Sequence, residues 1–240
     1  MTDEELFVWD INGFHIIRGA LDDAQIASIH ELFDENHASS PRNAETTSRQ
    51  KSNPIEWGPA VQELIDYAPA FVCLERVLGP NFRLDHDYCM DLEAGKPGLA
   101  FHGDNSISGS CWYRCQDGMS RSGLTAVIYC LTDAGPEDGG FMCIPGSHKS
   151  NFPNLLPEEV LMKERHADYI LQPAVNAGDV IIFTEALMHA TRSWKRKTNR
   201  RALFLKYCPG HGAYYAHKYA DGDYSHLTER QRQLLRPPGM

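Results

Sequence analysis

A histidine and an aspartate lie two residues apart in the stretch Leu99-Ala-Phe-His-Gly-Asp-Asn105. The residues around them predict a short extended segment, and side chains at positions i and i+2 of a strand point to the same face. An imidazole and a carboxylate on one face can bind a divalent metal, and a third ligand from elsewhere would still leave half of the coordination sphere open. His102 and Asp104 are therefore predicted to begin a 2-His-1-carboxylate site for non-haem iron.

A second His-x-Asp pair, His166 and Asp168, competes with the first. It lies in the charged run from Lys163 to Asp168, which is typical of a solvated surface turn. His102 instead follows apolar residues and precedes a loop rich in glycine and serine, as expected at the mouth of a cavity. The pair at 102 and 104 is therefore the predicted metal pair.

His189 is the candidate for the third ligand. The stretch Ala177-Gly-Asp-Val180 predicts a tight turn that leads into an apolar strand, and His189 falls at the start of the next predicted strand. A lone histidine in this position can equally be a buried core residue. On this pattern alone the third ligand remains a hypothesis.

Short apolar segments separated by Gly, Pro, Asn and Asp run through most of the chain after residue 81. Several short strands at such spacing favour an antiparallel sandwich or barrel, and the lack of helices between them argues against a parallel α/β sheet. The predicted strands are 13–18, 82–92, 99–102, 124–131, 140–144, 169–171, 180–183, 189–193 and 202–207.

Helices are predicted mainly before this region. Asp22 followed by Gln25 is the signature of a capping box, so a helix is expected to run to about Asn36. A second helical region spans about 59–78, with Pro69 expected to break it, and a short capped helix follows Thr228. The expected fold is mainly β with flanking helices, a jelly roll of the cupin-like, double-stranded β-helix type. We expect a single domain over 1–240, with a helical N-terminal third packed on a jelly-roll core of about 81–208.

Composition excludes several classes of partner. The net charge of −9 disfavours nucleic acid and anionic membranes, and no apolar run is long enough to cross a bilayer. The start, Met-Thr-Asp-Glu-Glu, lacks the regions of a signal peptide, so a cytoplasmic location is expected. Seven cysteines without framework spacing predict reduced thiols. The oligomeric state cannot be read from the sequence.

Four motifs together resemble the phytanoyl-CoA dioxygenase family of Fe(II)- and 2-oxoglutarate-dependent oxygenases. They are Phe-His-Gly-Asp ending at Asp104, the stretch from Asp138-Gly-Gly to Pro-Gly-Ser-His-Lys149, Ala177-Gly-Asp-Val-Ile-Ile-Phe183, and His189 followed after ten residues by Arg200. The resemblance covers about residues 10–210. It implies a double-stranded β-helix with iron on His102, Asp104 and His189, 2-oxoglutarate bound by Arg200 with a hydroxyl contact from Thr191, and O2 as the oxidant.

The chemistry of this family requires such residue types. Three ligands on one face of the metal leave two positions for the 2-oxo acid and one for O2. The distant carboxylate of 2-oxoglutarate would be costly to bury unpaired, and arginine can bind it through two charged hydrogen bonds. An aspartate at 104 favours hydroxylation, or another oxidation such as demethylation or desaturation, over halogenation, since related iron halogenases carry a small residue there.

The hydrophobic pattern of the last predicted strand favours Arg201, and not Arg200, as the arginine that faces inward. Alternation groups Arg200 with Ala202, Phe204 and Lys206, whereas Arg201 falls with large apolar residues. Hydrophobicity alone would therefore turn Arg201 inward. Both faces can be buried in a double-sheet fold covered by helices, and the family spacing selects Arg200.

Substrate residues are less well defined. Trp112, Tyr113 and Arg114 in the loop from 105 to 122 are expected to form a substrate wall, with a surface loop as the alternative. His86 and Tyr88 share one face of the preceding strand and are candidates to line the cavity, although core packing explains them equally. His211, Tyr214 and Tyr215 near the C-terminus are further candidates. The loop 37–54 is either a solvated connector or a lid over the site, and a lid role for 105–122 is left open, whereas His148 in the Pro-Gly-Ser-His-Lys turn is expected to be structural.

The predicted function is oxidation of an unidentified small organic molecule with release of succinate and CO2. A non-catalytic sensor or carrier of the same fold is the alternative, and it would have no need of three metal ligands together with Arg200. A metal hydrolase with the same ligands would have no use for Arg200 either.

Overall fold

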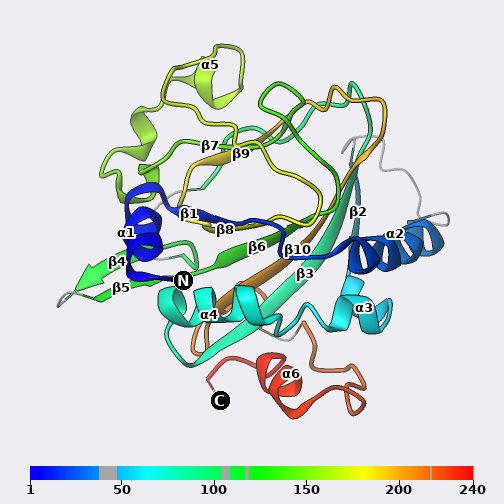
Figure 1. The fold of residues 1–240 in the computed structure, drawn as a ribbon. Helices are drawn as coiled ribbons and strands as arrows, with labels where there is room; N and C mark the ends of the chain where they lie inside the picture. Colours follow the sequence, from blue (N-terminus) through cyan, green and yellow to red (C-terminus); the bar gives the residue numbers. More distant parts are fainter. Residues whose placement is uncertain (38–47, 104–108, 117–118, 217, 240) are drawn as a thin grey trace.

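The structure is a computed structural model that describes residues 1–37, 48–103, 109–116, 119–216 and 218–239. Its largest element is an antiparallel sheet of six strands in the order β1-β8-β6-β10-β3-β2 (Figure 1). The bounds of these strands are β1 Phe14–Ile17, β8 Val180–Thr184, β6 Thr125–Cys130, β10 Arg200–Pro209, β3 Phe82–Leu92 and β2 Ser48–Ser52. Among the described residues, this sheet contains all but four of the strands.

Two smaller antiparallel pairs complete the β structure. β7 (Gly140–Cys143) pairs with β9 (His189–Arg192), and β4 (Tyr113–Gln116) pairs with β5 (Met119–Ser122). Phe141 and Cys143 of β7 pack in one cluster with side chains of the large sheet. The mainly β fold and the two facing sheets predicted from the sequence are confirmed.

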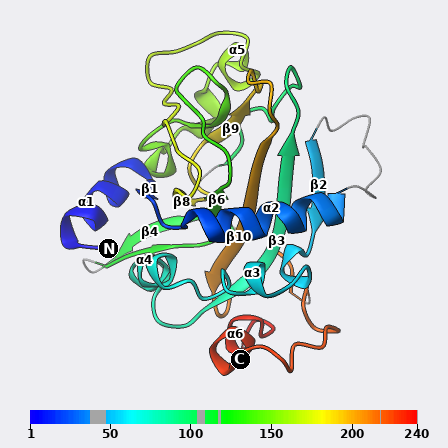
Figure 2. The ribbon, with the colours of Figure 1, turned by 45° about the vertical axis from the view of Figure 1, so that its right-hand side comes forward.

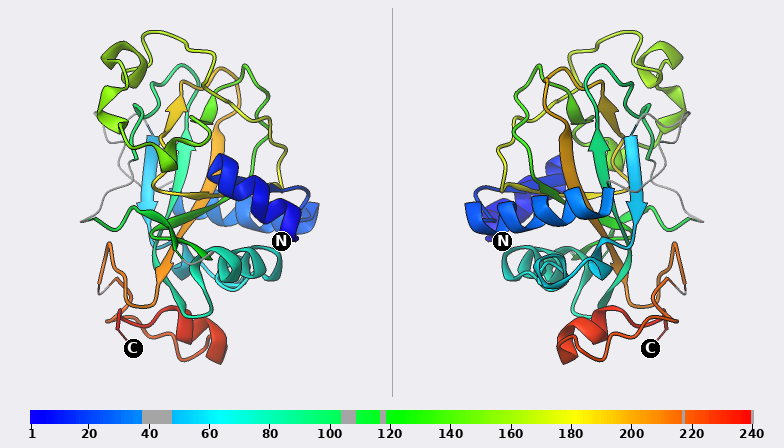
Figure 3. Two further views of the ribbon diagram at one scale, coloured as in Figure 1. Left: turned by 90° about the vertical axis from the view of Figure 1, so that its left-hand side faces the viewer. Right: turned by 90° about the vertical axis from the view of Figure 1, so that its right-hand side faces the viewer.

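Helices cover the other face of the large sheet, as Figures 2 and 3 show for α2 and α4. The bounds of the α-helices, including α5, which packs beside the small sheet of β7 and β9, are α1 Asp3–Asn12, α2 Asp23–His37, α3 Pro59–Gln62, α4 Ala68–Leu78, α5 Glu158–Leu161 and α6 Glu229–Leu234. The capping box before α2 forms as predicted, because the Gln25 amide N–H donates to Asp22 and the Asp22 amide N–H donates to Gln25. α6 is capped in the same way by Thr228 and Gln231.

Alternation along β10 separates two cores. Leu203, Leu205 and Tyr207 face the helices and pack in one cluster with residues such as Ile29 and Phe33 of α2. The other face packs between the two sheets, in a cluster that includes Ala202, Phe204, Met90, Phe141 and Phe183. Both faces of β10 are therefore buried, and Arg200 and Lys206 lie on the inner face, between the two sheets.

Four segments differ from the strands and loops predicted from the sequence. Residues 48–52, expected in a loop, form β2 on the edge of β3, since edge pairing needs backbone hydrogen bonds rather than apolar side chains; residues 38–47 of the same predicted loop lie outside the described residues. Residues 113–122, also expected in a loop, form the β4–β5 hairpin around residues 117–118, which are not described. The predicted strands 99–102 and 169–171 do not form, and only His102 and Leu171 of these segments make isolated bridges.

The helical region at 59–78 also divides differently. It consists of α3 and α4, and Pro69 lies in the first turn of α4 instead of ending a helix. Proline is tolerated there because the first amide groups of a helix have no intrahelical partner. None of the seven cysteines, all of which lie in described ranges, is part of a disulfide. Within the same ranges no helix is long and apolar enough to cross a membrane.

Candidate metal centre and substrate cavity

His102 and His189 are brought together by a backbone bridge. The amide of His102 donates to the carbonyl of His189 at 2.9 Å, and the amide of His189 donates back at 2.8 Å. His189 starts β9, which is fixed on its other side by pairing with Cys143 of β7. The two imidazole rings lie 4.1 Å apart between centroids, so residues 87 positions apart in the sequence share one site.

Backbone carbonyls orient both rings. Nδ1 of His102 lies 2.9 Å from the carbonyl oxygen of Ala100, and Nδ1 of His189 lies 2.7 Å from that of Leu187. A carbonyl can only accept, so each Nδ1 carries the proton and each Nε2 keeps its lone pair. Burial lowers the pKa of His189 to about 4, although Glu185 opposes this shift, and so keeps the ring neutral. A neutral imidazole with a fixed tautomer is the form that binds a metal, so this pair fits a divalent ion.

Gly103 allows the backbone after His102 to approach the residues that follow β8. Its φ is +103°, and a Cβ at this position would lie 2.3 Å from the carbonyl oxygen of Leu187. This φ is not that of a strand, so strand geometry does not continue through Gly103. Asp104 itself lies outside the described residues. Within the described part of the chain, no third His, Cys, Asp or Glu completes a metal site with the two histidines.

Arg200 begins β10 on its inner face and is 5% exposed. Its Nη1 lies 3.3 Å from the sulfur of Met90, and no carboxylate of the described residues lies within 4.0 Å of the guanidinium. Burial lowers the pKa of Arg200, but an arginine remains charged in proteins. A buried guanidinium without a counterion is a site prepared for an anion.

Arg201 has the opposite environment. Its guanidinium forms an ion pair with Asp34, lies 3.9 Å from Asp91 and packs over the ring of Phe33. It faces the helices and is already paired. The structure therefore turns Arg200, and not Arg201, into the space between the sheets.

Thr191 lies two residues after His189 on β9 and is 9% exposed. Alternation places its side chain on the same face of the strand as the His189 imidazole. The Phe183 ring packs against His189, with centroids 4.6 Å apart. Thr191 and His189 are thus buried on one side of the small sheet.

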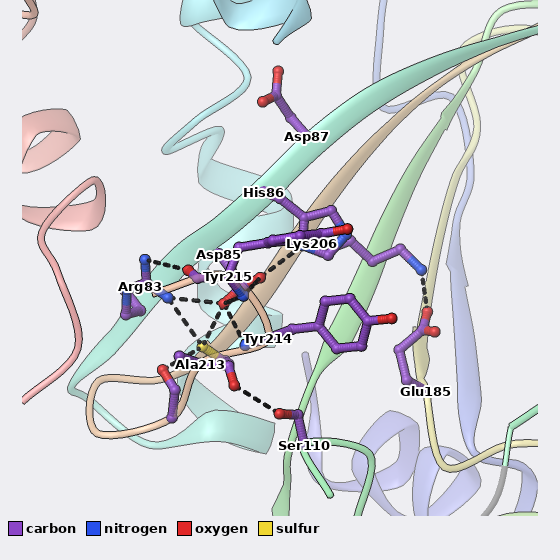
Figure 4. A network of polar contacts seen from close by, with 12 residues as sticks. Arg83, Asp85, His86, Asp87, Ser110, Glu185, Lys206, Ala213, Tyr214 and Tyr215 are labelled. Atoms are coloured by element: carbon purple, nitrogen blue, oxygen red, sulfur yellow. Dashed lines mark hydrogen bonds and ion pairs between the residues drawn. The ribbon is translucent and has the colours of Figure 1, made fainter. Parts of the chain in front are cut away.

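A cavity of about 530 Å³ opens beside His102. His86 and Tyr88 of β3 line it, as predicted, and Tyr214 and Tyr215 form another side. Figure 4 shows His86, Tyr214 and Tyr215 close together, with Lys206 and Glu185 beside them. Tyr214 and Tyr215, two of the candidates near the C-terminus, therefore line the cavity, whereas His211 does not.

The predicted wall residues of the 105–122 loop are placed elsewhere. Of the described part of this loop, Cys111 reaches the cavity, whereas Trp112, Tyr113 and Arg114 do not line it. The hairpin formed by β4 and β5 carries Tyr113 toward α1, where its hydroxyl donates to Asp10 and its ring packs on His148. Whether residues 104–108 act as a lid falls outside the described residues.

Glu185 and Lys206 are site residues that the sequence analysis did not identify. Lys206 Nζ donates to Glu185 Oε1, and the two side chains are 6% and 7% exposed. Burial by itself would raise the pKa of Glu185, but the charge and hydrogen bond of Lys206, together with the neighbouring imidazoles, outweigh burial and the pKa falls to about 2. The signal was present in the sequence, because Lys206 shares the inner face of β10 with Arg200.

The remaining histidine candidates are outside the site. His166 and Asp168 are exposed on a turn. His148 is fully buried, and its Nε2 donates to the backbone carbonyl of Asp10 at 3.1 Å. His148 is therefore a buried residue outside the site, in agreement with the structural role expected from the sequence.

Comparison with known proteins agrees with this geometry. Residues 9–202 match the family Phytanoyl-CoA dioxygenase (PhyH), and a search of curated protein sequences gave no match. HygX from Streptomyces hygroscopicus, solved with nickel and 2-oxoglutarate, superposes with a TM-score of 0.76 at 26% identity over 87% of each chain. The same protein has been solved with hygromycin B in addition, at 25% identity, a TM-score of 0.76 and coverage of 87% of this chain and 88% of that one. The epimerase SnoN from nogalamycin biosynthesis shares the fold at 16% identity, with a TM-score of 0.67 over 87% of this chain and 83% of its own. The chain belongs to the phytanoyl-CoA dioxygenase family of Fe(II)- and 2-oxoglutarate-dependent oxygenases.

Proposed function

We propose that this enzyme hydroxylates, or otherwise oxidises, a C–H bond of a polar small molecule and converts 2-oxoglutarate to succinate and CO2. The observation that carries the proposal is the combination of two converging Nε2 atoms, on His102 and His189, with the unpaired buried guanidinium of Arg200. A metal hydrolase would need the histidines and not the arginine. A carrier released from catalysis would need neither in this combination.

Each residue has a defined role in the proposal. His102 and His189 bind Fe(II) through Nε2, and Asp104 supplies the carboxylate ligand expected from the sequence. Arg200 binds the distant carboxylate of 2-oxoglutarate through two charged hydrogen bonds, with Thr191 as a hydroxyl partner. When bound, the iron supplies the activation of O2 that couples oxidation of 2-oxoglutarate to oxidation of the substrate.

The substrate is proposed to be a small organic molecule. The cavity of about 530 Å³ is in the range of sites for drug-sized ligands. HygX has been solved with hygromycin B, and SnoN, which shares the fold, with nogalamycin RO. Phytanoyl-CoA does not follow from the family name, because one fold serves many substrates.

The proposal is tested by adding Fe(II) and 2-oxoglutarate to the protein without oxygen. A chelated iron(II)–2-oxo acid complex has a weak visible charge-transfer band, which we expect for the unsubstituted protein and not for Asp104→Ala. Absence of the band from correctly folded protein would refute the proposal. A band without succinate release, on admission of O2, across a panel of small molecules would favour the carrier.

A further inference from the structure

A buried ion pair borders the metal site without being part of it. Glu185 follows β8, Lys206 lies on the inner face of β10, and both line the cavity beside His102 (Figure 4). Lys206 Nζ donates to Glu185 Oε1 and lies 5.7 Å and 5.6 Å from the ring centroids of Tyr88 and Phe183. Two charged groups in such a place are costly to bury, and neither is among the residues proposed above to bind iron or 2-oxoglutarate.

The second oxygen of Glu185 is directed toward the metal histidines. Its Oε2 lies 3.8 Å from Nε2 of His189, and no hydrogen-bond donor contacts it among the residues that the structure describes. His189 cannot serve as the donor, because its proton is on Nδ1. A carboxylate oxygen that is buried and open to a cavity has unused acceptor capacity, and leaving it unpaired is unfavourable. It is therefore suited to accept a hydrogen bond from a ligand next to the metal.

The opposite side of the cavity is a wall of three aromatic rings, His86, Tyr214 and Tyr215, which we call the aromatic wall. The His86 ring lies 5.7 Å from Tyr214 and 4.9 Å from Tyr215 between centroids, and the two tyrosines lie 5.0 Å apart. Tyr214 and Tyr215 remain 58% and 49% exposed. Aromatic faces left open to a cavity can stack on the apolar face of a ring or on a cation.

Asp85 holds this wall in place. The register of β3 and β10 shifts between Lys206 and Tyr207, so Asp85 is an extra residue opposite that step, a β-bulge. Its carboxylate accepts the amides of Tyr214 and Tyr215, at 2.8 Å and 3.1 Å, and Nδ1–H of His86 at 2.7 Å (Figure 4). Arg83 compensates its buried charge at 2.9 Å. Exposed rings on a backbone fixed in this way are preorganised for binding.

The ion pair and the aromatic wall together favour one kind of ligand. The Glu185–Lys206 ion pair is neutral as a whole, and the two other charged side chains of the lining, Asp87 and Lys218, have opposite signs, so the lining does not favour a free carboxylate or an acyl chain. Glu185 requires a hydroxyl or amino donor, and the aromatic wall requires a flat apolar face. In Figure 4 the ring of Tyr214 extends toward Glu185, so a single ring-shaped molecule can meet both.

We propose that the substrate is a hydroxylated ring compound, a sugar or cyclitol, that donates a hydroxyl or amino hydrogen bond to Glu185 and stacks on the aromatic wall. Lys206 positions Glu185 for this contact. The inference rests on the proposed oxygenase function, since it concerns the same cavity. It adds the substrate class and the residues that select it.

The test measures binding of defined probes to the protein loaded with Fe(II) and 2-oxoglutarate under anaerobic conditions. The probes are myo-inositol, methyl β-D-glucopyranoside, 2-deoxystreptamine and neamine, with decanoate and benzoate as probes of other chemistry. Calorimetry gives the dissociation constant, and the charge-transfer band reports whether the probe binds near the metal. We expect saturable binding and a changed band with at least one hydroxylated ring, and neither with decanoate or benzoate.

Variants then assign the contact. The double variant Glu185→Gln/Lys206→Met removes both charges together and leaves no buried ion unpaired, and it should weaken ring binding by about 10-fold or more. Tyr214→Ala should weaken it several-fold, whereas Tyr214→Phe, which keeps the ring, should not. Tyr169→Ala is the matched control, because Tyr169 is 48% exposed and does not line the cavity. Circular dichroism checks that each variant is folded.

The outcomes separate this inference from the function on which it rests. A charge-transfer band that no hydroxylated ring perturbs, a preference for decanoate or benzoate, or equal binding by the double variant would each overturn the assigned substrate class. Only the absence of the band itself would reject the oxygenase function.

Discussion

Arg200 occupies the space that a side chain at Gly140 would fill. A Cβ on Gly140 would lie 2.9 Å from Nε and 3.2 Å from Cδ of Arg200, and the φ of Gly140 is +92°. Gly140 starts β7 and Arg200 starts β10, so the two facing sheets meet at this point. This contact explains the Asp-Gly-Gly motif physically, because Gly140, its second glycine, makes room for the guanidinium of Arg200.

Gly140→Ala should therefore weaken 2-oxoglutarate binding while the fold is kept. The new methyl group must push Arg200 away from its position, so we expect the 2-oxoglutarate concentration needed for half of the charge-transfer band to rise about 10-fold. Gly95→Ala is the matched control, since Gly95 also has a positive φ, +74°, but nothing within 4 Å of its Cβ. Both variants carry about 1 kcal/mol of backbone strain. Equal effects of the two on 2-oxoglutarate affinity would contradict this explanation.

Arg200→Lys should weaken 2-oxoglutarate binding more strongly. Lysine keeps the charge and loses the two-pronged geometry, so the loss of one charged hydrogen bond predicts about a 10- to 100-fold higher dissociation constant. Arg201→Lys provides the comparison on the neighbouring position, because Arg201 is paired with Asp34 on the outer face. Titration of the charge-transfer band measures both. Should Arg201→Lys give the larger change, the assignment of the co-substrate to Arg200 is wrong.

Gly103→Ala should weaken metal binding. Its Cβ would lie 2.3 Å from the carbonyl oxygen of Leu187 and 2.9 Å from that of Glu185, so the backbone must move and the bridge between His102 and His189 must open. We expect a loss of Fe(II) affinity of about 10-fold or more, measured by competition with a chelator. Gly19→Ala, at a φ of +56° with nothing within 4 Å, should bind iron normally. Normal iron binding by Gly103→Ala would show that the close approach is not required.

His148 should make the stability of the protein depend on pH. Burial lowers its pKa to about 4, and its Nδ1 is buried without a hydrogen-bond partner. The unfolded state, with a pKa near 6.5, therefore binds more protons between these values, so stability is present above about pH 6.5 and is lost as the pH falls toward 4. The difference between the pKa values of His148 in the folded and unfolded states corresponds to about 3 kcal/mol of unfolding free energy.

Urea unfolding of the metal-free protein between pH 7.5 and 4.5 measures this dependence. His148→Gln lacks the titrating group, so the difference in unfolding free energy between it and the unsubstituted protein should shrink with falling pH. Asp87, whose pKa is raised to about 6 by burial, contributes with the opposite sign in both proteins and cancels in the difference. A difference that does not change with pH would exclude this role for His148.

Local patterns in the sequence were sufficient for most of the strands and for the placement of several site residues. Continuous apolar runs identified β6 and β8, because a strand buried on both faces favours such a run, whereas β3 was identified by apolar residues that alternate with polar ones. Alternation on β10 placed Arg200 and Lys206 together on one face. The polar strand β2 and the β4–β5 hairpin were not predicted, since their pairing is carried by backbone groups that every sequence has in common.

What the tertiary structure decided is which distant side chains share one space. His102 meets His189 through a backbone bridge, Gly140 leaves room for Arg200, and Glu185 pairs with Lys206 on one side of the cavity. Asp85, the bulge residue of β3, fixes Tyr214 and Tyr215 beside the cavity, whereas the β4–β5 hairpin places Tyr113 away from it. The chain alone determines the kinds of residues and the faces they occupy, because these depend on local periodicity. Their convergence depends on the register and crossing of strands that pair across most of the chain, and no local pattern encodes that.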